Sequence, residues 1–427
     1  MLDIRLIREK PETVRDNLAR RQDAEVLARF EEIRTVDRQW REATSKVERV
    51  RADRNKLAAE IGQAKKAGHA PSPDTVARSQ ALPKELEAAE TTVEALRLEL
   101  DRLAMRLPNL LHESVPFGKD DSENQVVATW GAPRENPSAI HHGELAERLG
   151  LADFERAAKI AGSGFAFLKG DLALLDLSLQ RFALDLLAER GFTPVLTPVM
   201  MRRAPYEGVT DLADFEKVMY KIEGEDLYLV ATSEHPLGGM FAGEILDEDA
   251  LPLRLAGISP CFRREIGAHG VDTRGLFRMH QFNKIEQFVF CDPDDSWAIH
   301  EEIRQNAEEI FRRLAIPYRV VNVCTGDIGT VAAKKYDIEA WSPRQRKYIE
   351  VVSCSNCTDY QARRLKIRAG KAGGDKRVAH TLNSTAVATS RALVAILENG
   401  QRDDGTVEVP AALRPYLGKD TLGASLR

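Results

Sequence analysis

A heptad repeat of apolar residues runs through the N-terminal part of the chain and limits the folds open to it. Apolar side chains recur in alternating three- and four-residue steps from Ile33 to Ala64 and again from Leu82 to Leu107, as in the seam of a coiled coil. The breaker-rich turn KKAGHAPSPD separates the two runs. Two long helices joined by a short turn must run antiparallel, so the sequence predicts a two-helix arm. Pro83 either kinks the second helix or begins it.

The length of the chain predicts more than one domain, because 427 residues exceed what a single core usually supports. A loop-like stretch that is rich in proline and polar residues follows residue 107, and we interpret it as a hinge. The predicted domains are an N-terminal arm at residues 1–107 and a second domain at residues 108–427. Within the second domain, a strong helical pattern ends at Gly191 and a proline-containing β-rich run follows it.

The composition favours a globular protein rather than a membrane protein. The chain is 43% hydrophobic and 30% charged, and its net charge of -5 means that any RNA binding must come from a local basic patch. No apolar run approaches membrane-spanning length, and the N-terminal sequence MLDIRLIREKPETVR lacks the apolar core of a secretion signal. We therefore expect a cytoplasmic protein with no membrane partner.

The five cysteines are an odd and scattered set, which suits reduced thiols. Cys354 and Cys357 form the motif CSNC, which has the spacing of half a zinc site or of a redox dithiol. A structural zinc needs two further ligands at comparable spacing, and the sequence holds no second CxxC or HxxxH. Packed free thiols are therefore the preferred interpretation.

The stretch CFRREIGAHGVDTRGLFRMHQFNKIEQFVF, from Cys261 to Phe290, reads as two strands joined by a polar loop that could close over a ligand. Side chains at i and i+2 of a strand share a face. This alternation places Arg263 and Glu265 together on the first strand, and Arg278, His280, Phe282, Lys284 and Glu286 together on the second. A solvated lattice of ion pairs would explain the charges but not the aromatic ring. A phosphate-bearing ligand with a flat base explains both, because guanidinium groups grip phosphate and rings stack on bases.

Three shorter segments carry weaker signals. In LYLVATSEHPLGGM, Thr232 and Glu234 end a β-like run, and a carboxylate beside a hydroxyl suits an ammonium group. In KYIEVVSC, Glu350 lies on an apolar strand, where it either binds a ligand or simply forms an ion pair. Arg391 opens a helix in HTLNSTAVATSRALVAILENG, although a helix start favours negative charge. Placing an arginine there is unfavourable, but a nearby phosphate would make it favourable.

The wording FRREIGAHGVDTRGLFRMHQFNKIEQF resembles the second signature motif of class II aminoacyl-tRNA synthetases and is most similar to that of seryl-tRNA synthetases. The helix and strand around Gly191 resemble the first motif, which builds a dimer interface in the family, and the segment around Arg391 resembles the third. The resemblance covers essentially the whole chain and keeps the family's order. It implies an α+β fold in which helices flank a mostly antiparallel sheet, an N-terminal antiparallel coiled-coil arm, and a homodimer.

The resemblance also implies an activity. A seryl-tRNA synthetase activates L-serine with ATP and Mg²⁺ to seryl-adenylate and transfers serine to the 3′ end of tRNA(Ser); the sequence leaves open whether tRNA(Sec) is charged as well. The family's coiled-coil arm grips the long variable arm of the tRNA, which favours an RNA-binding role for the basic residues of the first long helix, among them Arg38, Arg41, Lys46 and Arg49. A solvated charged face is the alternative.

Site residues follow from the same resemblance. ATP binding is implied for Arg263, Arg264, Glu265, Arg278, Met279, Phe282, Glu350, Val351, Val352, Ser353 and Arg391; Mg²⁺ binding for Glu350 and Ser353; and serine binding for Thr232, Ser233, Glu234, Arg263, Glu286, Asn383 and Thr385. The catalytic roles fall to Arg263 and Arg391. Two other functions remain to be separated by experiment: an adenylate-forming paralogue that loads another acceptor, and a non-catalytic RNA-binding relative. The intact arm argues against the first, and the retained arginines and glutamates argue against the second.

Overall fold

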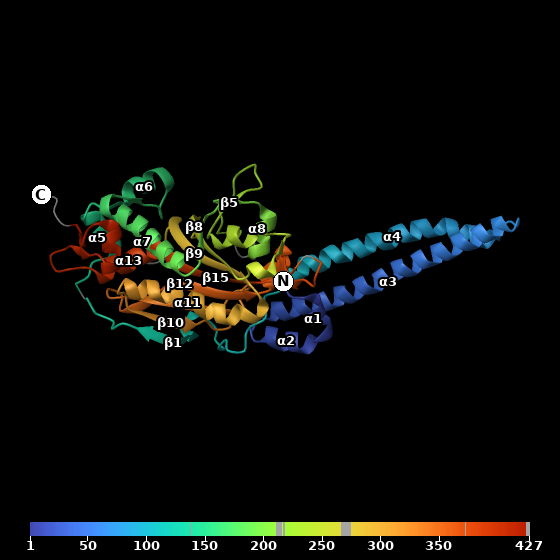
Figure 1. Cartoon of the computed structure of the whole chain (residues 1–427), viewed down its shortest axis with the longest axis horizontal. Helices are drawn as coiled ribbons and strands as arrows, with labels where there is room; N and C mark the ends of the chain where they lie inside the picture. Colours follow the sequence, from blue (N-terminus) through green and yellow to red (C-terminus); the bar gives the residue numbers. More distant parts are fainter. Residues whose placement is uncertain (137, 211–215, 217, 266–274, 372, 424–427) are drawn as a thin grey trace. The chain divides into compact units, whose positions relative to one another are not determined.

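The computed structural model describes residues 1–136, 138–210, 216, 218–265, 275–371 and 373–423. The chain forms two compact units, Met1–Pro108 and Asn109–Arg427. The first unit is helical throughout, and Figure 1 shows its two long helices side by side. Its helices are α1 (Ile4–Glu9), α2 (Pro11–Ala19), α3 (Ala24–Lys66) and α4 (Pro73–Ala104).

The long helices begin where capping side chains satisfy their first N–H groups. The Asp23 carboxylate accepts hydrogen bonds at the start of α3, and the Ser72 hydroxyl accepts one from the Thr75 N–H at the start of α4. Pro83 lies inside α4, so the alternative in which the second helix begins at Pro83 is wrong. Part of the predicted heptad seam is a buried cluster of Val47, Val50, Leu82, Leu86 and Ala89. An ion pair of 2.7 Å between Arg51 and Glu90 also joins the two helices.

An eight-stranded sheet forms the centre of the second unit. Its order is β1-β10-β11-β12-β15-β9-β8-β4, and every pair is antiparallel except β4 with β8. The strands are β1 (Gln125–Trp130), β4 (Thr193–Leu196), β8 (Leu253–Phe262), β9 (Gln281–Cys291), β10 (Tyr318–Asn322), β11 (Lys334–Ser342), β12 (Lys347–Thr358) and β15 (His380–Ala388). The predicted α+β fold with a mostly antiparallel sheet is confirmed.

Helices cover the sheet and close its core. α7, α11 and α13 contact the central strands, and their apolar faces join one large buried cluster with β9, β12 and β15 (Figure 1). The helices of the unit include α5 (His142–Arg148), α6 (Phe154–Ala161), α7 (Gly170–Glu189), α8 (Arg203–Val209), α10 (Glu234–Gly239), α11 (Ser296–Arg313), α12 (Tyr360–Leu365), α13 (Thr389–Asn399) and α14 (Arg414–Leu417).

Short elements complete the second unit. Small sheets pair β2 (Ala152–Asp153) with β3 (Phe167–Leu168), β5 (Met200–Met201) with β6 (Tyr228–Leu229), and β16 (Val407–Glu408) with β17 (Thr421–Leu422). A further small sheet joins β7 (Ile245–Leu246), β13 (Arg368–Ala369) and β14 (Arg377–Val378). Single 3₁₀ turns are η1 (Asp121–Glu123), η2 (Glu248–Ala250), η4 (Pro293–Asp295) and η5 (Ala411–Leu413).

The two strands predicted around the arginine-rich motif are present but shorter than expected. β8 ends at Phe262 and β9 begins at Gln281, so strand alternation does not govern Arg263, Glu265, Arg278 or His280. Glu265 even has φ of 46°, which an extended strand cannot accommodate. Strand alternation therefore does not explain how these four side chains are arranged. The loop expected to close over a ligand falls largely on residues 266–274, which lie outside the described residues.

All five cysteines are buried free thiols, including Cys354 and Cys357 on β12. Within the described ranges, no group of three or more His, Cys, Asp or Glu side chains is placed to hold a metal ion. None of the helices in the described part of the chain combines the length and apolar character needed to cross a membrane.

Candidate active site

A cavity of about 460 Å³ opens over the strands β9, β15 and β12. Its volume falls in the range of small-molecule sites, roughly 300–1,000 Å³. Strand residues form its floor, and the segments that follow β8 and precede β9 form part of its wall. The cavity brings together most of the predicted site residues: Thr232, Glu234, Arg263, Glu265, Arg278, Met279, Phe282, Glu286, Glu350, Val351, Ser353, Asn383, Thr385 and Arg391.

A buried ion pair lies at the deep end of the cavity. Lys284 and Glu286 point the same way from β9, and Lys284 Nζ lies 2.6 Å from a Glu286 carboxylate oxygen, with side chains only 7% and 2% exposed. Thr385 on β15 is the register partner of Glu286, and its hydroxyl donates to that carboxylate at 3.3 Å. Burial raises the pKa of Glu286, while Lys284 and the hydrogen bonds oppose the rise. The carboxylate is therefore held by a cation and a hydroxyl.

A second carboxylate, Glu234, faces the same end from the first turn of α10. One of its oxygens accepts from Asn383 Nδ2 at 3.1 Å and from Gln361 Nε2 at 3.0 Å. Burial and the neighbouring Glu286 raise the pKa of Glu234 to about 7. Its own N–H donates to the Thr232 hydroxyl at 3.2 Å, which ties the two residues together. The deep end therefore holds two carboxylates in different environments.

Arg263 lies between the two ends of the cavity, directly after β8. Its N–H donates to the His280 carbonyl at 2.9 Å, and its Nε donates to the Ala231 carbonyl at 3.3 Å. Its guanidinium lies 5.3 Å from the centre of the Phe282 ring, close enough for a cation–π contact. These contacts hold a cation and an aromatic face together in the middle of the cavity.

The outer end is rich in arginine. Arg278 lies 3.4 Å from the Glu265 carboxylate. Arg391 is in the first turn of α13. Its guanidinium pairs with the Glu350 carboxylate at 3.1 Å and donates to the Glu350 carbonyl at 2.8 Å. It also lies 5.4 Å from the centre of the Phe277 ring. Guanidinium groups set in this way are suited to phosphate oxygens.

A β-bulge explains how Glu350 and Ser353 line one cavity. In a regular strand, a spacing of three would put them on opposite faces. Here Glu339 pairs with Glu350 while its neighbour Ile338 pairs with Val352, so β12 contains one extra residue at Val351. The bulge restores the two oxygen-bearing side chains to the same side. Enclosure would raise the pKa of Glu350, but Arg391, Lys335 and Arg263 lower it, which keeps the carboxylate charged.

Three predicted residues do not line the cavity. Ser233 is fully buried, and its hydroxyl donates to the Gly257 carbonyl at 3.3 Å. The exposed residue Arg264 donates its backbone N–H to the Val218 carbonyl at 2.8 Å. The side chain of Val352 belongs to the large hydrophobic cluster. The roles expected for these side chains stay predictions.

Several residues that the sequence did not assign to the site also line the cavity: His235, Phe277, Lys284, Asp327, Lys335 and Cys357. Alternation along β9 had placed Lys284 on the face of Glu286, so that signal was present in the sequence. Lys335 pairs with Asp337 at 3.4 Å on β11. Burial would lower the pKa of Lys335, but Asp337, Glu350 and Asp327 together raise it. Nothing in the local sequence indicated that β11 reaches the cavity.

Two family models match the chain. The model described as "tRNA synthetase class II core domain (G, H, P, S and T)" matches residues 217–400, and the model described as "Seryl-tRNA synthetase N-terminal domain" matches residues 1–111. The sheet and the arginine-lined cavity are those of a class II aminoacyl-tRNA synthetase, as the first model indicates.

Relatives define the family more narrowly. Proteins named serine–tRNA ligase from Methanocella arvoryzae and Methanoculleus marisnigri are 61% and 58% identical; the matches cover 98% and 99% of this chain and 99% and 100% of theirs. The crystal structure of seryl-tRNA synthetase from Pyrococcus horikoshii complexed with ATP matches with a TM-score of 0.95 and 50% identity, over 99% of both chains. The chain belongs to the seryl-tRNA synthetase family, and its activity is serine–tRNA ligation.

Proposed function

We propose that the cavity binds L-serine at its deep end and ATP at its arginine-rich end, and that it joins them as seryl-adenylate before serine is passed to tRNA(Ser). One observation carries this assignment: a single cavity holds a buried, cation-paired carboxylate at one end and three arginines toward the other. The Pyrococcus horikoshii neighbour, whose structure contains ATP, supports the nucleotide end of the assignment.

At the deep end, the hydroxyl and the ammonium group of serine each have a chemically suitable partner. Glu286 and Thr385 suit the serine hydroxyl, because a carboxylate accepts a hydrogen bond from it and a threonine hydroxyl can donate or accept one. Glu234 and Asn383 suit the ammonium group. Alanine lacks the hydroxyl and would leave the buried carboxylate of Glu286 without that partner, so alanine is expected to be rejected strongly.

At the other end, the proposed roles follow from charge and planarity. A serine carboxylate oxygen attacks the α-phosphorus of ATP, the new O–P bond forms as the bond to pyrophosphate breaks, and Arg263 stabilises the charge that develops there. Phe282 stacks on adenine with Glu265 at its edge, while Arg278 and Arg391 hold the outer phosphates. A 3′ hydroxyl of the tRNA then displaces AMP from the adenylate.

The residues at the bulge fit Mg²⁺. Glu350 presents a charged carboxylate and Ser353 a hydroxyl to the same cavity, and Mg²⁺ needs only a few protein oxygens beside phosphate and water. When bound there, the ion would neutralise phosphate charge. Arg391 would have to exchange its ion pair with Glu350 for a phosphate group.

Replacing Arg263 with alanine tests the central assignment. Serine-dependent ATP–pyrophosphate exchange should fall by at least roughly a hundredfold, because the cation that stabilises the transition state is removed. Arg254→Ala is the matched control: it also removes an arginine of the central sheet, one that pairs with Glu302 at 3.0 Å and does not line the cavity, and it should keep near-parent exchange. Near-parent exchange by Arg263→Ala would refute the assignment. Exchange without tRNA charging would instead favour a paralogue that loads another acceptor.

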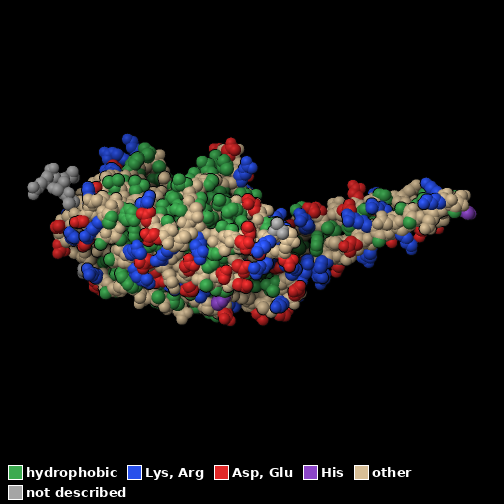
Figure 2. Space-filling view, viewed as in Figure 1, with side chains coloured by type: hydrophobic (Ala, Val, Ile, Leu, Met, Phe, Trp, Pro, Cys, Tyr) green, Lys and Arg blue, Asp and Glu red, His purple; other side chains and the backbone are tan. Residues whose placement is uncertain are grey.

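We also propose a homodimer that forms through α7 and the edge strand β4. Leu174 and Leu177 lie on one face of α7 and are 50% and 59% exposed, and Leu196 on β4 is 81% exposed. Figure 2 shows hydrophobic side chains gathered where Figure 1 labels α6, α7 and β8. Contiguous exposed apolar surface of this kind marks interaction sites.

Sedimentation equilibrium tests the dimer. Leu177→Asp should raise the dissociation constant by at least roughly tenfold, because a charge would be buried without a partner. Leu98→Asp changes an equally exposed leucine, 57%, on the arm helix α4 and should leave the dimer intact. A parent protein that sediments as a monomer would contradict the proposal.

We propose a cytoplasmic location as well. The reaction and the five reduced thiols both favour it.

A further inference from the structure

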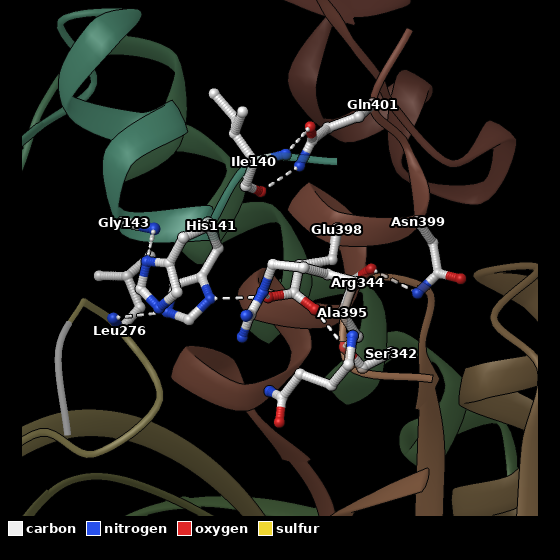
Figure 3. Close-up of polar contacts among 12 residues, drawn as sticks. Ile140, His141, Gly143, Leu276, Ser342, Arg344, Ala395, Glu398, Asn399 and Gln401 are labelled. Atoms are coloured by element: carbon white, nitrogen blue, oxygen red, sulfur yellow. Dashed lines mark hydrogen bonds and ion pairs between the residues drawn. The ribbon is translucent and has the colours of Figure 1, made fainter. Parts of the chain in front are cut away.

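A buried histidine lies outside the cavity but contacts one of its walls. His142 opens α5 and is 1% exposed. Its Nδ1 lies 3.0 Å from a carboxylate oxygen of Glu398, and its Nε2 accepts a hydrogen bond from the Leu276 N–H at 3.1 Å. Figure 3 shows Leu276 on one side of the imidazoles and Glu398, with Arg344 and Ser342, on the other.

The partners of the imidazole fix which nitrogen carries the hydrogen. Besides His142, the Glu398 carboxylate accepts from the Ser342 hydroxyl and from Arg344 Nε at 3.3 Å. Burial would raise the pKa of Glu398, but these hydrogen bonds and charges lower it, so the carboxylate is ionised. An ionised carboxylate can only accept, and a backbone N–H can only donate. His142 therefore carries its hydrogen on Nδ1 and presents a lone pair on Nε2 to Leu276.

Leu276 begins the segment that forms the outer wall of the cavity. The next residue, Phe277, packs its ring against Arg391 at 5.4 Å, and Arg278 reaches Glu265 at 3.4 Å. α13 carries Arg391 in its first turn and Glu398 in its last. The chain of contacts through Glu398, His142 and Leu276 therefore ties the far end of α13 to the same segment that Arg391 contacts at the near end.

The backbone at Leu276 is shaped for this contact. Gly275 has φ of 80°, which disfavours other residues, and a Cβ there would lie 2.6 Å from His142 Nε2. The imidazole thus sits directly against the backbone. Gly143, next to His142, also approaches closely, since a Cβ on it would lie 3.0 Å from the Gly275 Cα.

We propose that His142 is a positioning residue for ATP: its Nε2 lone pair anchors the Leu276 N–H and so sets the place of Arg278 and Phe277 relative to Arg391. This inference rests on the proposed roles of Arg278 and Arg391 at the outer phosphates. His142 touches neither substrate. It acts through the wall segment, and Glu398 acts by holding the tautomer in which Nε2 can accept.

Two amide substitutions separate the acceptor from the rest of the side chain. The amide of asparagine reaches the position of Nδ1, so His142→Asn keeps a donor for Glu398 and loses the acceptor. The longer glutamine amide reaches the position of Nε2, so His142→Gln keeps an acceptor for Leu276. In ATP–pyrophosphate exchange, His142→Asn should raise the KM for ATP roughly tenfold and change the KM for serine less than about twofold, because a buried N–H is left without its partner. His142→Gln should keep the parent KM for ATP.

Gln401→Ala is the matched control. Gln401 makes two hydrogen bonds to the backbone of Ile140, at 3.0 and 2.8 Å. It therefore joins the residues just before α5 to the chain beyond α13 without contacting Leu276. This variant should lower the Tm by about as much as His142→Asn while leaving the KM for ATP unchanged. Assays are run below the lowest Tm. If His142→Asn does not fold, His142→Phe, which fills the ring volume without an acceptor, replaces it.

The outcomes decide between positioning and simple packing. Equal KM values for ATP in the glutamine variant and in the variant without an acceptor would overturn the inference, as would parallel rises in the KM for ATP and for serine. A rise confined to ATP in the variant without an acceptor, with glutamine restoring the parent value, supports it. Absence of serine-dependent exchange in the parent would instead refute the proposed function itself.

Discussion

Two carboxylates share the deep end of the cavity, but different groups surround them. Glu286 has an ammonium group 2.6 Å away, so its ionised form has a direct partner. Glu234 accepts hydrogen bonds from the amides of Asn383 and Gln361, and burial and Glu286 raise its pKa to about 7. Paired acids in unlike environments commonly divide their tasks. Here Glu286 suits a neutral hydroxyl, and Glu234 suits a cation that supplies the missing charge.

This difference predicts how serine binding depends on pH. Serine should bind the ionised form of Glu234, so its KM in ATP–pyrophosphate exchange should fall as pH rises from about 6 to about 8, by roughly tenfold for each pH unit below the pKa. The stability of the free protein should change in the opposite direction. Folding raises the pKa of Glu234, so the free energy of unfolding should fall as pH rises from the pKa of the unfolded chain toward 7. Glu234→Gln should raise the KM and flatten its pH dependence. A KM for serine that rises with pH in the parent would contradict this account.

Among the elements, β9 and β12 show what the sequence could and could not predict. Alternation along β9 correctly placed Phe282, Lys284 and Glu286 in one cavity. Arg263 and Arg278 line the same cavity as predicted, but from segments beyond the ends of β8 and β9, and local alternation does not show where strand pairing stops.

For β12, the sequence could not predict which residues face the cavity. Glu350 and Ser353 share a cavity only through the bulge at Val351, and a bulge depends on the partner strand rather than on local sequence. Lys335 and His142 reach their places through tertiary pairing that no local pattern records. Their assignment therefore needed the structure, whereas the residues in the signature motifs did not.

The packing of α10 against β8 makes Gly257 a sensitive position. A Cβ at Gly257 would lie 2.8 Å from the Ser233 Cβ and 2.7 Å from a methyl carbon of Leu237, so α10 would have to move. Thr232 and Glu234 flank Ser233 and would move with it. Gly257→Ala should lower the free energy of unfolding by about 1–3 kcal/mol and raise the KM for serine more than the KM for ATP.

Gly374→Ala is the control for that substitution. Its nearest atoms would lie 3.6 Å from the new Cβ, so stability and kinetics should both stay at parent values. Denaturant unfolding and exchange kinetics measure the two effects. A Gly257→Ala protein with an unchanged KM for serine would show that α10 can shift without disturbing the deep end of the cavity.

At the scale of the whole molecule, each of the two compact units has apolar clusters of its own. Val47, Val50, Leu82, Leu86 and Ala89 form a buried cluster inside Met1–Pro108. The large cluster around the central sheet draws only on residues of Asn109–Arg427. Removing the long helices should therefore leave the core of the second unit complete. The two steps of the reaction can then be assigned to different parts of the chain.

Excision of residues 34–100, with the ends bridged by a short linker, should preserve serine-dependent exchange but severely reduce the charging of tRNA(Ser). Much of the affinity of a protein for RNA comes from cations at phosphates, and α3 carries a group of them: Arg38, Arg41 and Arg49 line a shallow groove, with Lys46 nearby in the sequence. Arg41 also pairs with Asp37 at 3.0 Å, which orients its guanidinium.

Charge neutralisation makes the same prediction sharper. Changing Arg38, Arg41, Lys46 and Arg49 together to glutamine should flatten the salt dependence of tRNA binding by roughly one unit of slope for each side chain that no longer neutralises a phosphate. The control changes four ion-paired arginines of the second unit, Arg203, Arg312, Arg313 and Arg402, by the same net charge. It should leave the salt dependence of tRNA binding unchanged, because the proposed phosphate contacts come from the basic residues of α3 and not from the net charge of the protein. Parent-level charging by the shortened protein would remove the RNA-binding role and leave the heptad seam as a device for assembly.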